Sequence, residues 1–141
     1  MKTEADVASY LGTEGCILYA QAFSTISSVI PSFCKRGDVI VADRAVNFSI
    51  RKGLDISRSN IKWYNHNDMD DLELVMQKVV KDQAKKKLTR RFIVTEGLFE
   101  TTGDSIDLPR LVSRQLLSPV MSGSASLTCR VLGIDRAQGK V

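Results

Sequence analysis

The stretch Val39-Ile40-Val41-Ala42-Asp43-Arg44 decides the fold, because it is a short apolar run that ends directly in a polar turn. The unit recurs where 61–64 runs into Asn65-His66-Asn67-Asp68, and where 92–95 runs into Glu96-Gly97. The segments between these runs have helical spacing, so the sequence predicts the order β-α-β-α-β. That order is typical of an α/β fold with a parallel sheet, whose ligands collect at the carboxyl ends of the strands. We therefore look for chemistry in these three turns.

The composition is that of one globular domain. The chain has 141 residues, of which 43% are hydrophobic and 26% are charged. No apolar run approaches the roughly 18 residues of a transmembrane helix, and the start lacks the hydrophobic region of a signal peptide. Cys16, Cys34 and Cys129 are odd in number and widely spaced. We therefore expect buried free thiols and not a disulfide framework or a zinc site.

Apolar spacing also places the helices. A helix from Glu4 to Leu11 is followed by a short strand at 17–19 and by a helix from about Gln21 to Ile30, which Pro31 closes. Another helix buries Val46, Ile50 and Leu54, and one more starts near 108–109. The clearest helix opens at Asn67 or Asp68, and its buried stripe is Met69, Leu72, Val75, Met76, Val79 and Val80.

The positive charge is local. From Lys78 to Arg91, seven basic residues stand against Asp82, whereas the whole chain carries only +4. A nucleic-acid site at Lys85-Lys86-Lys87 is one interpretation. The other is a solvated helix end, whose cations suit the carboxyl-terminal dipole. The second is favoured, because no aromatic residue inside the basic run offers a stacking surface.

Familiar catalytic patterns are missing from the sequence. His66 is the single histidine, which excludes a mechanism with two imidazoles, and we expect its ring to cap or fill a strand–helix corner. The sequence contains no Gly-rich phosphate loop, no nucleophile elbow and no cluster of metal ligands. The residue types alone therefore leave an α/β domain of unknown chemistry.

Longer motifs are more specific. The stretches 35–44, 53–59, 66–73 and 89–99, followed by Gly103-Asp104, resemble in order the α-oxoamine synthases. These enzymes use pyridoxal phosphate to condense an amino acid with an acyl-CoA. The residues at 43–54 and 89–97 are similar to those of one branch of this family, the non-catalytic (long-chain base) subunits of serine palmitoyltransferase. Over residues 1–112 the resemblance implies a partial large domain of the aspartate-aminotransferase-like (fold type I) fold, with a mostly parallel sheet flanked by helices.

The resemblance also implies a cofactor site, and this chain departs from it. Catalytic relatives have a His at the position of Asn47, a Ser at Ser49, a Gly at Ala22 before Phe23, and a Ser at Glu100. The Asn amide has no aromatic face, Ala22 hinders close backbone approach to an anion, and Glu100 would face an anionic cofactor. We therefore expect a pseudo-site at Ala22, Phe23, Asn47, Ser49 and Glu100, with no catalytic residue, no metal and no pyridoxal phosphate bound by this chain.

The implied function is that of a supporting subunit. Serine palmitoyltransferase condenses L-serine with palmitoyl-CoA to 3-ketosphinganine in sphingolipid biosynthesis at the endoplasmic reticulum membrane. This chain would form a heterodimer with a catalytic subunit that holds pyridoxal phosphate, and serine and palmitoyl-CoA would bind at the shared site. It would bind no nucleic acid and be inactive alone. The alternatives are an active pyridoxal-phosphate-dependent acyltransferase and a basic nucleic-acid-binding module.

The resemblance stops abruptly near Val112. In the family, the lysine that holds the aldehyde and the carboxylate on the pyridine nitrogen lie beyond the matched segment. Residues 113–141 lack clear periodicity, and we expect a tail from a shifted reading frame or alternative splicing. The membrane-spanning amino terminus of the family is also missing, so we expect a cytosolic fragment.

Overall fold

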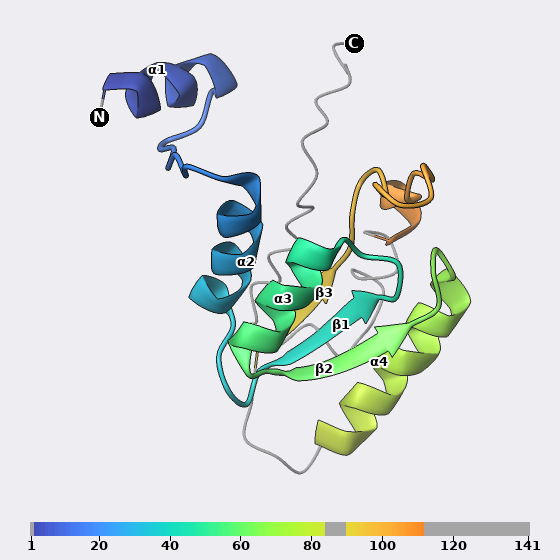
Figure 1. Ribbon diagram of the computed structural model, residues 1–141. Coiled ribbons are helices and arrows are strands. Elements are labelled where there is room, and N and C mark those ends of the chain that lie inside the picture. The colour runs from blue at the N-terminus through green and yellow to red at the C-terminus, as the bar shows by residue number, and fades with distance from the viewer. Residues whose placement is uncertain (1, 84–89, 112–141) are drawn as a thin grey trace.

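A computed structural model describes residues 2–83 and 90–111, and every structural statement below concerns these two ranges (Figure 1). The predictions for Lys85–Lys87, for Cys129 and for the tail at 113–141 lie outside the described residues and stay predictions.

The centre of the fold is β1 (Val39–Asp43), the middle strand of a three-stranded parallel sheet with the order β2-β1-β3. Val39 lies opposite Asn60 of β2 (Asn60–Tyr64) and opposite Arg91 of β3 (Arg91–Val94). All five residues of β1 are buried, as expected for a parallel strand covered on both faces. The predicted α/β fold with a parallel sheet is confirmed.

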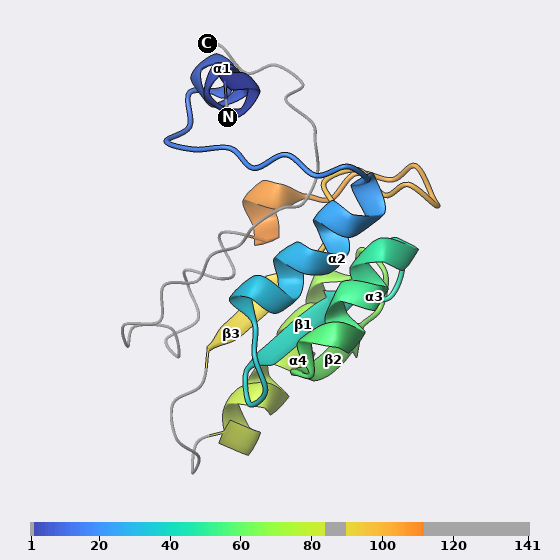
Figure 2. The same ribbon diagram turned by 60° about the vertical axis from the view of Figure 1, so that its left-hand side comes forward.

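Helices cover both faces of this sheet. The chain leaves β1 through α3 (Phe48–Ser57) to reach β2, then returns through α4 (Met69–Gln83) across β1 to reach β3. Because such crossovers are right-handed, opposite directions of travel put α3 and α4 on opposite faces. Figures 1 and 2 show α2 (Ala22–Phe33) beside α3 on one face and α4 on the other.

The contact between α2 and α3 depends on a glycine. A Cβ atom at Gly53 would lie 3.1 Å from the Ile30 Cδ1 atom and 3.2 Å from the backbone oxygen of Ile26. The two helices can therefore pack this closely because position 53 has no side chain. On the other face, Met69, Leu72 and Val79 are buried, and Val75, Met76 and Val80 are half-buried, which confirms the stripe predicted for α4.

Two local predictions are wrong. The segment 17–19 is not a strand but a coil between α1 (Lys2–Leu11) and α2, and Ile17 is 73% exposed. Its residues suit a strand, but none of the strands in the described part of the chain lies beside them to pair with. Pro31 does not end α2, which continues to Phe33, and the N–H of Cys34 bonds the Ile30 carbonyl oxygen at 2.9 Å. The predicted turn of helix near Leu108 is present, at 108–111.

The described thiols differ in burial. Cys34 is buried as predicted, and burial raises the pKa of its thiol to about 11, with the Asp38 charge adding and the Arg90 charge opposing. Cys16 is only half-buried, because it lies in the coil between α1 and α2, so the prediction of burial is wrong there. Within the described ranges, no helix is both long and apolar enough to cross a membrane.

Candidate functional site

The polar turns that follow the three strands meet at one edge of the sheet. Because the strands are parallel, Asp43 at the end of β1, His66 after β2 and Glu96 after β3 lie on the same side. The starts of α3 and α4 lie there too, since each follows a strand directly. The turns predicted to carry chemistry are therefore brought together, and they form two connected clusters.

The first cluster is built on the buried carboxylate of Asp43, which is 0% exposed. Its Oδ1 accepts a hydrogen bond from the Ala45 N–H at 2.7 Å, and its Oδ2 accepts one from the Asn67 N–H at 3.0 Å. Oδ1 also lies 3.1 Å from Nδ1 of His66. One carboxylate thus ties the turn after β1 to the turn after β2.

His66 extends this cluster to the loop that follows β3. Its Nε2 lies 3.2 Å from Oδ2 of Asp104 and 3.3 Å from Oγ1 of Thr102, and its ring meets Phe99 edge-on at 4.4 Å between centroids. The ring fills the strand–helix corner as predicted. A neutral imidazole has one N–H and cannot donate to both Asp43 and Asp104, whereas a protonated ring can donate to both.

The two carboxylates set the charge state of this ring. Partial burial lowers the pKa of His66, but hydrogen bonds to Asp104 and Asp43 and the charges of both carboxylates together outweigh it, so the pKa is raised above its ordinary value. Since the raised value belongs to the folded state, protonation stabilises the fold. That stability is fully present below the unfolded pKa of about 6.5 and is lost as the pH rises through the higher folded-state pKa.

We therefore expect the unfolding temperature of the wild-type chain to fall as the pH is raised from about 6 through neutrality, and His66→Gln to flatten this dependence. Circular dichroism melts at matched ionic strength measure both. Lys52→Gln serves as the control. It removes the cation of an exposed ion pair on α3, in which Lys52 Nζ lies 3.8 Å from Oδ2 of Asp55. If His66→Gln and Lys52→Gln show the same slope between these pH values, the imidazole does not carry the effect.

The second cluster is centred on Asn47, the N-cap residue of α3. Its Oδ1 accepts a hydrogen bond from the Ser49 N–H at 2.6 Å. Its backbone N–H donates to the carboxylate of Glu96, and its side-chain Nδ2 donates to the carboxylate of Glu100. Glu96 is 6% exposed, so this cluster also contains a buried acid.

The structure brings most of the predicted pseudo-site residues together. Asn47, Ser49 and Glu100 are joined by the hydrogen bonds above. Phe23 stacks on Phe48, with ring centroids 6.2 Å apart, and Phe48 is the residue between Asn47 and Ser49 in the sequence. Ala22 is the exposed first residue of α2, beside Phe23. Their role as former cofactor positions stays a prediction.

Sequence reasoning missed the acids that hold these residues, namely Asp43, Glu96 and Asp104. Asp43 and Glu96 carried a usable signal, because each is an acid in the polar turn of a buried strand. Asp104 belongs to the Gly103-Asp104 motif, but nothing in the sequence paired it with His66, since the path of the loop brings the two together. Among the described residues, no group of three or more His, Cys, Asp and Glu side chains is placed to hold a metal ion.

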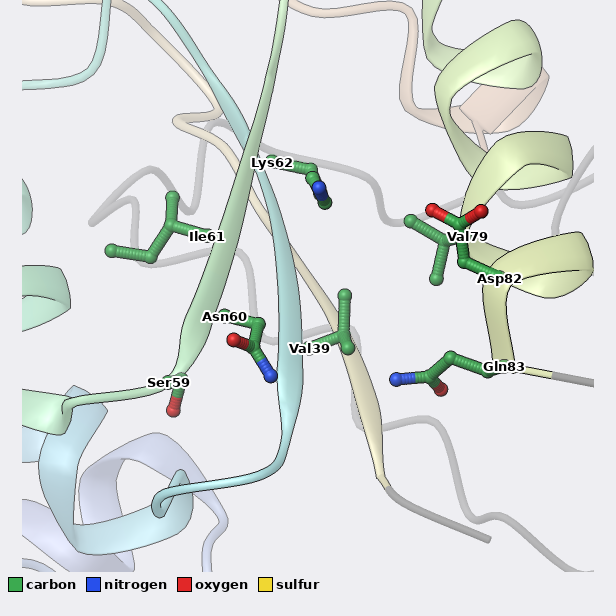
Figure 3. A pocket seen from close by; sticks show the side chains of 8 residues that line it. All are labelled: Val39, Ser59, Asn60, Ile61, Lys62, Val79, Asp82 and Gln83. Atoms are coloured by element: carbon green, nitrogen blue, oxygen red, sulfur yellow. The ribbon is translucent and has the colours of Figure 1, made fainter. Parts of the chain in front are cut away.

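A pocket of about 300 Å³ lies elsewhere, near the start of β1 and along β2 (Figure 3). Lys62 of β2 and Asp82 of α4 point into it from opposite sides. Val39, the first residue of β1, also lines it, so the pocket belongs to the amino-terminal edge of the sheet and not to the two clusters.

Comparison with known proteins finds relatives from the group that the sequence motifs resemble. Serine palmitoyltransferase 1 of Saccharomyces cerevisiae is 45% identical over 111 residues, which are 77% of this chain and 20% of the yeast protein. Long chain base biosynthesis protein 1 of Arabidopsis thaliana is 41% identical over 109 residues, or 77% of this chain and 23% of the plant protein. The resemblance to serine palmitoyltransferase proteins is confirmed, and the chain spans about a fifth of the length of these relatives.

Solved structures agree on the fold. A serine palmitoyltransferase from Sphingomonas wittichii superposes with a TM-score of 0.68 at 22% identity, covering 80% of this chain and 27% of the other. A serine palmitoyltransferase with a pyridoxal phosphate internal aldimine gives 0.70 at 22% identity, covering 82% and 28%. The sequence profile of aminotransferase class I and II matches residues 2–115. The chain therefore belongs to the aminotransferase class I and II family.

Proposed function

We propose that this chain is part of a non-catalytic subunit of serine palmitoyltransferase, which supports a catalytic partner in sphingolipid long-chain base synthesis. The names of the relatives in yeast and Arabidopsis support the pathway. The partner holds pyridoxal phosphate and, at the shared boundary, L-serine and palmitoyl-CoA. The full-length protein works at the endoplasmic reticulum membrane.

The observation that carries the non-catalytic role is the chemistry around Asn47. Pyridoxal phosphate brings a flat ring, a phosphate and a phenolic oxygen, so it needs a stacking surface and donors or cations around its anionic groups. At Asn47 the chain offers an amide without an aromatic face, and the carboxylates of Glu96 and Glu100 both lie against that residue. These residues do not fit the cofactor, which supports a chain that leaves the chemistry to its partner.

The two alternatives have less support. An active acyltransferase would need an aromatic ring at position 47 to stack on the cofactor. It would also have to bind the anionic cofactor beside the carboxylate of Glu100, which lies against Asn47. A nucleic-acid module rests on the basic run at 78–91, and the relatives give no reason for it.

The test is a bulky substitution at the proposed boundary. In the full-length parent, we expect Asn47→Trp to preserve co-purification with the catalytic subunit. We also expect it to lower condensation of serine with palmitoyl-CoA by on the order of ten- to hundredfold, because an indole would displace groups in the partner's site. Product formation is measured at equal heterodimer yield.

The matched control is Asn60→Trp, which adds the same ring to an exposed position at the opposite edge of the sheet. That variant should retain normal condensation. Equal activity of the two variants at normal heterodimer yield would place Asn47 away from the catalytic cleft and remove the main support for the proposal.

A further inference from the structure

Every polar group of Asn47 has a partner within the chain. The backbone N–H donates to Glu96 and the side-chain amide donates to Glu100. The side-chain oxygen accepts from Ser49 at 2.6 Å, and the backbone oxygen accepts from the Arg51 N–H at 3.0 Å. Each of the four polar atoms of Asn47 is therefore already bonded within the chain.

The loop that carries Glu100 is held by its own backbone hydrogen bonds. The N–H of Phe99 bonds the Asp104 carbonyl oxygen at 2.8 Å, and the N–H of Gly103 bonds the Phe99 carbonyl oxygen at 2.8 Å. The buried Phe99 and the N–H of Glu100, which lies 3.4 Å from the Glu96 carboxylate, fix the start of this loop. The backbone at Glu100 is therefore held by bonds within the loop, and the exposed Glu100 side chain reaches Asn47 of the turn before α3.

The two residues are chemically complementary. An amide at position 47 supplies a donor that a carboxylate at position 100 accepts, and a hydrogen bond to a charged group is stronger than one between neutral groups. The bond joins residues 53 positions apart and links the turn after β1 to the loop after β3. Two departures that look separate in the sequence thus form one contact.

We propose that Asn47 and Glu100 are a coupled pair that closes the former ring position by linking α3 to the loop after β3. The two side chains join the two strand ends directly. The proposal rests on the proposed function for the meaning of the site, but its test needs no partner and no cofactor.

The test uses Asn47→Asp, because aspartate caps a helix as well as asparagine does. If Asn47 acts only as the cap of α3, this variant should unfold at the wild-type urea concentration. If it also donates to Glu100, the new carboxylate faces those of Glu100 and Glu96, and the urea midpoint should fall clearly. Amide exchange at Ser49 should also speed up relative to Asp71, whose N–H is bonded by the Asp68 cap of α4 at 3.0 Å.

A second substitution reverses the polarity of the pair. In the Asn47→Asp background, Glu100→Gln supplies an amide that donates to the new carboxylate, so the midpoint and the protection of Ser49 should return toward wild type. Glu14→Gln in the same background removes one negative charge at an exposed position in the coil before α2 and should rescue nothing.

Two results would overturn the pair. They are a wild-type midpoint for Asn47→Asp, and equal effects of Glu100→Gln and Glu14→Gln in the Asn47→Asp background. Neither bears on condensation with the partner. The pair can therefore fail while the subunit role stands, and the Asn47→Trp assay can fail while the pair stands.

Discussion

Asp43→Ala should destabilise the domain by about 3–5 kcal/mol, because it leaves buried N–H groups without acceptors at roughly 1–3 kcal/mol each. The Ala45 and Asn67 N–H groups both lose the carboxylate, and His66 loses the partner of its Nδ1. The loss of unfolding free energy should appear as a lower midpoint of urea unfolding, with an unchanged dependence of that free energy on urea concentration.

Two further variants sharpen this result. Asp43→Asn keeps one oxygen but turns an NH2 group toward a donor, so its loss should fall between wild type and Asp43→Ala. Asp55→Ala removes an exposed acid, 3.8 Å from Lys52, and should cost at most about 0.5 kcal/mol. A loss for Asp43→Ala no larger than that for Asp55→Ala would show that the turns do not depend on the carboxylate.

Val41→Asp should prevent folding. Val41 is 3% exposed in the central strand, and a carboxylate there would be buried without a partner. The expected loss exceeds about 4 kcal/mol, which is comparable with the whole stability of many domains. Far-UV circular dichroism and the soluble yield measure the outcome.

The control is the residue opposite Val41 in the sheet, Lys62 of β2, which is exposed. Lys62→Asp introduces the same side chain in the same register and should cost no more than about 1 kcal/mol. Folding of Val41→Asp with wild-type yield would mean that β1 is not covered on both faces.

The elements could be predicted where burial is local. The run at 39–42 and the stripe of α4 show which side chains face the core, because their spacing repeats within a few residues. The segment at 17–19 has suitable residues, but strand formation also needs a neighbour, and that depends on distant parts of the chain. Pro31 lies within the last turn of α2, two residues before Phe33, and removes only its own N–H from the helix.

The site was predictable in position but not in its bonding. Residue-by-residue resemblance pointed to Asn47 and Glu100, and the strand-end rule pointed to the edge of the sheet where the polar turns meet. The bond between those two residues depends on how the loop after β3 turns back, which no local pattern encodes. The same holds for Asp104, which reaches His66 through the same loop.

The central position of β1 has a consequence for the order of folding. β1 comes first along the chain, but both strands that pair with it come later, β2 after α3 and β3 only after α4. Closing the shorter loop costs less chain entropy, so we expect β1, α3 and β2 to assemble first. Until β3 arrives, the most apolar strand keeps one open edge, and a growing chain is exposed there to pairing with other chains. We therefore expect β1 to be most open to such pairing before β3 is complete at Val94.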